Sequence, residues 1–192
     1  RHIQTIAAYI GQAAHARGIL LQECGAGYAA ATAAAGRVLF APIPDVKPVS
    51  AIAIVAGAVL GRRSGFVVGA VAALVSNFFF GQGSWTPWQM YAWGLVGYLG
   101  GVLSDHGALK RTWALYAWGF VSALMYGAIL NGYYVLGFVR PLTWPAVAAA
   151  YAAGAPLDIV HGIATAGFLA VIWLSWGRAI RRVVAKYDLA TR

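Results

Sequence analysis

The sequence predicts an all-α membrane protein with six transmembrane helices and both termini in the cytoplasm. Its composition, its apolar segments and the positions of its basic residues all lead to this prediction. Hydrophobic residues occupy 61% of the 192 positions and charged residues only 10%, whereas a soluble domain carries about 25% charged residues. Because so few charged side chains cannot cover a soluble globule, we expect one membrane-embedded domain over residues 1–192.

Apolar segments of helical length recur along the chain, and a spanning helix needs about 20 apolar residues. The predicted spans are residues 19–40, 49–60, 65–80, 88–103, 112–136 and 157–176. Residues 1–18 are expected to form an interfacial helix or the start of the first span, and residues 177–192 a basic cytoplasmic tail. Residues 138–156 are predicted to be a connection with at most a short helical stretch at 147–153.

Two further breaks in the apolar pattern separate predicted spans. Pro42, Pro44 and Pro48 interrupt any helix between the first two spans, because proline fixes φ and lacks a donor. Residues 81–87 contain two glycines and a proline and are typical of a turn.

The basic residues lie mostly on one side of the predicted topology. With six spans, three of the 14 Lys and Arg residues, Arg37, Lys47 and Arg140, fall on the side opposite the termini. The other eleven share the side of the termini: Arg1, Arg17, Arg62, Arg63, Lys110, Arg111, Arg178, Arg181, Arg182, Lys186 and Arg192. Cytoplasmic loops carry such an excess, so this side is predicted to be cytoplasmic.

The predicted outward side combines aromatic and polar residues. Asn77, Gln82, Thr86, Gln89 and Asn131 lie among many Phe, Trp and Tyr residues. Aromatic walls with a few polar groups are typical of an organic-ligand pocket. An aromatic belt at the lipid interface is the alternative explanation for about half of these aromatics.

Ionisable residues near the outward ends of the spans need a reason, because charge within a membrane is costly. Arg37 could meet a substrate or pair with Asp45 or Asp158. Asp158 and His161 are three residues apart and share a helix face, so they could contact substrate. Alternatively, Asp158 could stabilise the helix N-terminus through the helix dipole, with His161 as its partner. One His and one carboxylate do not make a metal site.

Small residues recur at four-residue spacing, which lets helices approach closely in lipid. The glycine pairs 57/61, 65/69 and 97/101 are expected to pack helices within the bundle. Ala26, Ala30 and Ala34 form a stripe on the first span that could instead dock another membrane subunit.

Several functional classes lack support in the sequence. There is no P-loop motif for ATP hydrolysis. Five acidic residues are too few for a multi-carboxylate metal site, and Cys24 is the only cysteine. We predict no catalytic residues, no metal, no cofactor and no nucleic-acid partner.

Three segments carry a resemblance to a known family. They are residues 36–49 (GRVLFAPIPDVKPV), residues 76–90 (SNFFFGQGSWTPWQM) and residues 156–161 (PLDIVH). They resemble the substrate-binding (S) components of energy-coupling factor (ECF) transporters, and the branch they resemble is that of cobalamin and its precursors. The sequence departs from the expected pattern in having Asp45 in place of Asn and Ser84 in place of Pro.

The resemblance implies a non-enzymatic, multi-pass subunit of the bacterial cytoplasmic membrane that binds a vitamin in an outward pocket. A transmembrane coupling subunit and two cytoplasmic ATPases would drive uptake, with the stripe of Ala26, Ala30 and Ala34 contacting the coupling subunit. The predicted substrate-binding residues are Arg37, Lys47, Asn77, Gln82, Trp85, Trp88, Gln89, Asp158 and His161.

Two other functions stay open at this point. An intramembrane enzyme could act on lipid or peptide through His161 with Ser76 or Asp158. A membrane scaffold would bind no small molecule at all.

Overall fold

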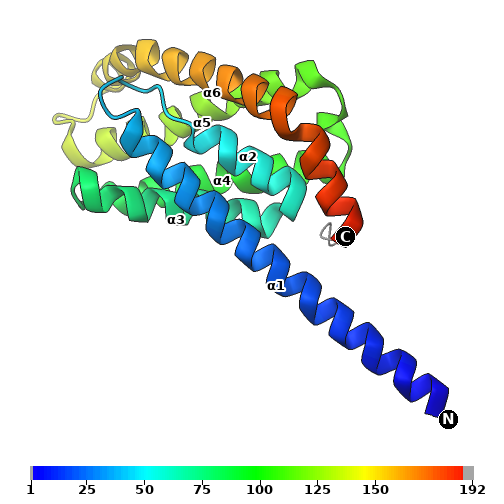
Figure 1. The fold of residues 1–192 in the computed structure, drawn as a ribbon. Coiled ribbons are helices and arrows are strands. Elements are labelled where there is room, and N and C mark those ends of the chain that lie inside the picture. The colour runs from blue at the N-terminus through cyan, green and yellow to red at the C-terminus, as the bar shows by residue number, and fades with distance from the viewer. Residues whose placement is uncertain (1, 188–192) are drawn as a thin grey trace.

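The fold is an all-helical bundle, seen in a computed structural model that describes the backbone of residues 2–187 (Figure 1). Side chains are described for residues 16, 18–20 and 22–173. The elements are α1 (His2–Leu39), α2 (Val49–Leu60), α3 (Arg62–Phe80), α4 (Thr86–Asp105), the short 3-10 helix η1 (Ala108–Lys110), α5 (Thr112–Phe138) and α6 (Trp144–Tyr187).

Helix α1 is one continuous helix of 38 residues. At 1.5 Å per residue it is about 57 Å long, well beyond the roughly 30 Å of a bilayer core. Its N-terminal part projects from the bundle (Figure 1). Because the helix is unbroken, no boundary separates residues 2–18 from the first span. The polar residue Gln22 is accommodated because its amide donates to the Leu60 carbonyl and to Ser64 Oγ.

Glycines bring α2, α3 and α4 into backbone contact, as their spacing predicted. A Cβ atom at Gly57 would overlap the carbonyl oxygen of Gly97, and one at Gly97 would overlap the carbonyl oxygen of Gly65. A Cβ atom at Gly69 would overlap the Trp93 carbonyl. Such close approach favours helix association in lipid, where apolar burial provides little driving force.

Three connections meet at the end of the bundle opposite the termini (Figure 1). They are residues 40–48, 81–85 and 139–143. Contacts join two of them through the end of α5: Ser84 Oγ lies 2.5 Å from the Tyr133 hydroxyl, and the Tyr133 ring packs on Trp88 and Phe138. The exposed connections with paired basic residues, at Arg62–Arg63 and Lys110–Arg111, lie at the other end.

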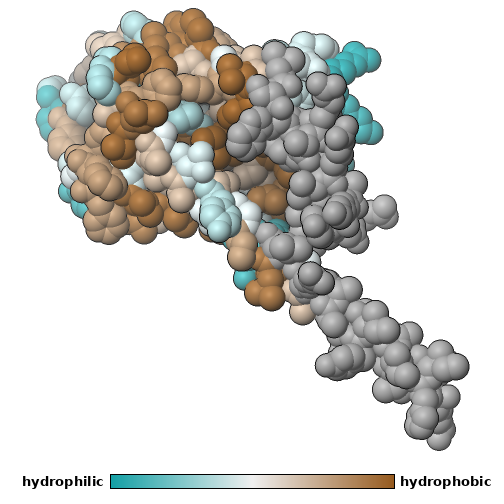
Figure 2. Space-filling view, viewed as in Figure 1, coloured by the Kyte–Doolittle hydropathy of each residue, from teal (hydrophilic) through white to brown (hydrophobic). Residues whose placement is uncertain are grey.

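The exposed surface is apolar over much of the bundle, as Figure 2 shows for the face in view. In the part of the chain whose side chains the structure describes, three helices, Arg62–Phe80, Thr112–Phe138 and Trp144–Trp173, are long and apolar enough to cross a membrane. Val49–Leu60 is a shorter apolar helix. These features indicate a polytopic membrane protein. The count of six spans stays a prediction.

The prediction of a connection over residues 138–156 was wrong for most of its length, because only residues 139–143 lie between the helices. Helix α6 begins at Trp144, is 44 residues long and contains Pro156 in its interior. Seven of residues 145–155 are alanine, the residue with the highest helix propensity. A membrane helix tolerates proline because neighbouring groups satisfy the freed backbone carbonyl.

Candidate functional site

Arg37, near the C-terminal end of α1, anchors a polar cluster inside the bundle. Its side chain is only 8% exposed. One guanidinium nitrogen donates to Ser76 Oγ at 2.7 Å and to Asn77 Oδ1 at 2.6 Å, both on α3. The Phe80 and Trp93 rings each lie 4.8 Å from the guanidinium carbon, within the range of cation–π attraction. The hydrogen-bond partners found for this cation are therefore neutral, rather than the predicted Asp45 or Asp158.

Asn77 connects Arg37 to the start of α4. It is fully buried, and its amide nitrogen donates to Thr86 Oγ1 at 2.9 Å and to Gln89 Oε1 at 2.8 Å. Thr86 in turn donates to Gln82 Oε1 at 2.9 Å. The motif of residues 76–90 thus folds back on itself, and this places Asn77 and Gln89 side by side.

A second group of buried side chains adjoins the first. Trp93 Nε1 donates to Ser50 Oγ at 3.0 Å, and Ser50 Oγ lies 2.9 Å from His161 Nε2. Since Ser50 has one hydrogen and accepts from Trp93, it can donate that hydrogen to a neutral His161. Tyr126 stacks on Trp93 at 4.5 Å and meets His161 edge-on at 5.2 Å. Residues of α1 to α6 therefore share one continuous polar and aromatic interior.

Asp158 lies one helical turn before His161 and serves a different contact. Its carboxylate accepts a hydrogen bond of 3.1 Å from Asn131 Nδ2 on α5 and rests against Gly127, where a Cβ atom would overlap it. Asp158 and His161, which were predicted to contact substrate together, therefore lie on the same helix face and have different hydrogen-bond partners.

The connection between α1 and α2 follows Arg37 in the chain and is held by its own contacts. Lys47 Nζ donates to the carbonyl oxygens of Phe40 and Ile43, both at 2.7 Å. Pro48 packs against Gly36, where a Cβ atom would overlap its ring. Asp45 adopts a positive φ of 54°. Burial lowers the pKa of Lys47, and Asp45 opposes that shift.

Asp45→Asn is expected to stabilise the protein at neutral pH. Burial raises the pKa of the Asp45 carboxyl, and nearby Lys47 only partly offsets this effect. A raised folded-state pKa means that the folded protein disfavours the carboxylate, so stability is greatest below the ordinary carboxyl pKa and falls as the pH rises through the raised value. Asn also tolerates positive φ.

Thermal unfolding of both proteins between pH 4 and 8 tests this expectation. The melting temperature of Asp45→Asn should exceed that of the wild type at pH 8, and the two should converge as the pH falls. A difference that is constant across this range would contradict the titration of Asp45 as the cause.

The aromatic residues divide into two groups. Phe78, Phe79 and Trp144 are 73%, 72% and 86% exposed, which suits the lipid-interface alternative. Trp85 and Trp88 are each 40% exposed, and Trp88 packs on Tyr133 at the rim. The structure therefore places these two predicted site residues beside the connections rather than within the polar interior.

The alanine stripe faces the interior of the bundle. Ala26, Ala30 and Ala34 are 7%, 4% and 4% exposed, and the first two pack with Ala56 and Val68. The stripe therefore lies against α2 and α3, and its role in docking a partner stays a prediction. A second small-residue ridge on α1, Gly27, Ala31 and Ala35, is exposed.

Comparison with models of protein families assigns this chain to a family. The family model of the ECF-type riboflavin transporter S component matches residues 24–181. The chain belongs to this family. No curated protein and no solved structure matches this chain.

Membership identifies a membrane subunit of a transporter rather than an enzyme. The structure also pairs His161 with Ser50, and neither with Ser76 nor with Asp158 as the enzyme alternative required. The expected family is thus confirmed, while the match to a riboflavin family gives no support to the cobalamin branch.

The structure brings together Arg37, Asn77, Gln89 and His161 from the predicted site of the S component, with Asp158 next to them. Gln82 joins through Thr86, and Lys47 lies in the connection above. Sequence reasoning missed Ser50, Trp93 and Tyr126 as site residues. Trp93 follows Gln89 by four residues and so shares its helix face, which was an available signal. Nothing in the pattern distinguished Ser50 or Tyr126 from packing residues.

Proposed function

We propose that this S component binds a vitamin with a flat heteroaromatic ring bearing imide or amide groups, with riboflavin as the first candidate. The binding site is the polar interior beneath the three connections. The observation that carries this proposal is Arg37, a buried cation held by the neutral partners Ser76 and Asn77. A buried charge in a membrane protein is costly and usually functional, and an oxygen-rich ligand would give it a further partner.

The chemistry around Arg37 suits such a ligand. Asn77 and Gln89 each offer an amide donor and acceptor, which can match the alternating donors and acceptors of an imide. Trp93 and Tyr126 are already stacked at 4.5 Å and provide aromatic faces for a ring. The pairs Ser50–His161 and Asn131–Asp158 supply further polar groups for hydroxyls on a side chain.

Binding at this site requires the connection of residues 40–48 to open. The ligand would enter from the outward side, displace hydrogen bonds among the buried side chains and be covered again as Lys47 re-forms its bonds to the Phe40 and Ile43 carbonyls. A coupling subunit and two ATPases, the partners that the family implies, would then drive release to the inside.

The experiment that tests the proposal is thermal unfolding of the purified protein with riboflavin and, separately, with cobalamin. A ligand at 100 times its dissociation constant should add about 2.7 kcal/mol to the free energy of unfolding. We expect riboflavin to raise the melting temperature. Stabilisation by cobalamin alone would assign the site to corrinoids, and stabilisation by neither vitamin would favour the scaffold alternative.

The docking surface for the coupling subunit is proposed to be the exposed ridge of Gly27, Ala31 and Ala35. Ala31→Trp is expected to abolish co-purification with the coupling subunit and ATPases, because a large side chain prevents close helix approach. Vitamin binding by the isolated subunit should be unchanged. Ala152→Trp, at an exposed alanine of α6, is the matched control, and equal complex formation by both variants would disprove this docking face.

A further inference from the structure

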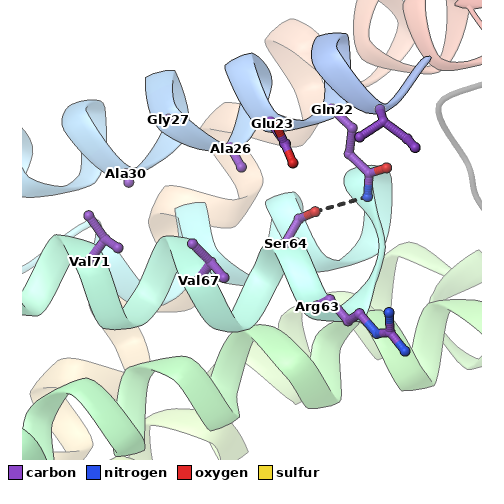
Figure 3. A pocket seen from close by; sticks show the side chains of 10 residues that line it. Gln22, Glu23, Ala26, Gly27, Ala30, Arg63, Ser64, Val67 and Val71 are labelled. Atoms are coloured by element: carbon purple, nitrogen blue, oxygen red, sulfur yellow. Dashed lines mark hydrogen bonds between the residues drawn. The ribbon is translucent and has the colours of Figure 1, made fainter. Parts of the chain in front are cut away.

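A groove of about 440 Å³ runs between α1 and α3, outside the polar interior. Figure 3 shows its two walls, with Ala26 and Ala30 on α1 facing Val67 and Val71 on α3. Its volume falls in the range of about 300–1,000 Å³ that is typical of small-molecule sites. The groove is open to the outside, since Val67 and Val71 are 50% and 36% exposed.

The groove changes character along its length. Ala30 and Val71 lie at one end, where all lining side chains are apolar. Glu23 and Arg63 lie at the other end, and both are exposed. Gln22 and Ser64 lie beside them and are hydrogen-bonded to each other at 3.0 Å (Figure 3). Such a gradient from two exposed side chains of opposite charge to an apolar channel matches an amphipathic ligand.

The dimensions of the groove match one leaflet of a bilayer. From Arg63 to Val71 the helix rises about 12 Å, close to half of the roughly 30 Å hydrocarbon core. The charged end lies at the turn between α2 and α3, on the side of the termini, where the positive-inside bias predicts the cytoplasmic surface. A lipid tail lying against Val67 and Val71 would therefore bring its headgroup to the level of Glu23 and Arg63.

We infer that this groove is a binding site for a zwitterionic phospholipid with a primary ammonium headgroup, such as phosphatidylethanolamine. The Arg63 guanidinium would contact the phosphate, because guanidinium groups bind phosphate oxygens strongly. The Glu23 carboxylate would accept hydrogen bonds from the ammonium. Phosphatidylglycerol has a phosphate and no ammonium, so Glu23 disfavours it at the same site.

The test is native mass spectrometry of the purified full chain, titrated with phosphatidylethanolamine or phosphatidylglycerol. We expect the wild type to retain one phosphatidylethanolamine, with about a tenfold preference over phosphatidylglycerol. Val67→Trp should fill the channel and abolish this retention. Val121→Trp on α5 should leave it unchanged, because Val121 is exposed to the same degree, 51% against 50% for Val67.

Glu23→Gln provides a second variant that does not depend on repacking the groove. It should remove the preference between the two lipids while leaving total lipid binding intact. Equal binding of both lipids by the wild type, or unchanged phosphatidylethanolamine retention in Val67→Trp, would overturn the inference. If the purified chain retained no lipid and the groove were covered only when the coupling subunit is bound, the inference would be overturned as well.

Discussion

Arg37→Met is expected to weaken vitamin binding by about 10- to 100-fold. Hydrogen bonds to a charged group contribute about 1.5–3 kcal/mol, and each 1.4 kcal/mol corresponds to a tenfold change in affinity. Methionine keeps most of the aliphatic length of arginine and can still pack between Phe80 and Trp93, so the loss would come from the guanidinium. Titration of intrinsic tryptophan fluorescence with riboflavin measures the effect.

Arg140→Met is the matched control for this prediction. Arg140 also lies at the outward end of the bundle, but it is exposed, and its guanidinium donates to the nearby carbonyls of Val139 and Leu136. Its replacement should leave the dissociation constant within about fivefold of wild type, since an exposed charge contributes about 0–1 kcal/mol. Equal effects of the two substitutions would exclude Arg37 as a ligand-binding group.

Gly97→Ala is expected to destabilise the folded protein by about 1–3 kcal/mol, the usual cost of overpacking. The added methyl group would overlap the carbonyl oxygen of Gly65. A backbone carbonyl cannot rotate away as a side chain does, so α3 and α4 would have to separate. Because both helices carry the Asn77–Gln89 pair, vitamin affinity should fall together with the melting temperature in detergent.

Gly167→Ala is the control for this second prediction. Gly167 lies within α6, and a Cβ atom there would meet nothing within 4 Å. Alanine at an open helical position is expected to be neutral or to stabilise the helix by up to about 1 kcal/mol. If Gly97→Ala melted at the same temperature as Gly167→Ala, the α3–α4 contact would not limit stability.

Much of the architecture could be predicted because membrane helices have strong local signals. Apolar length and the Lys and Arg distribution identified the polytopic class, and the glycine pairs identified close helix contacts. The prediction failed at residues 138–156, where Pro156 suggested a break but the alanine-rich segment continued the helix through it.

The candidate site was only partly predictable. Arg37, Asn77 and Gln89 were unusual as polar residues within apolar segments, and this signal is independent of tertiary structure. Ser50 and Tyr126 were not unusual for their segments, and only the packing of α2, α4, α5 and α6 around Trp93 brings them into the polar interior.

By itself, the sequence of this protein determined that it is a helical membrane protein and which polar groups are costly to bury. Only the tertiary structure decided which face of α1 is buried. That helix has small residues around most of its circumference, so Ala26, Ala30 and Ala34 could not be distinguished from Gly27, Ala31 and Ala35 by pattern. Contact with α2 and α3 buried the first set, because helix orientation in lipid depends on the neighbouring helices more than on polarity.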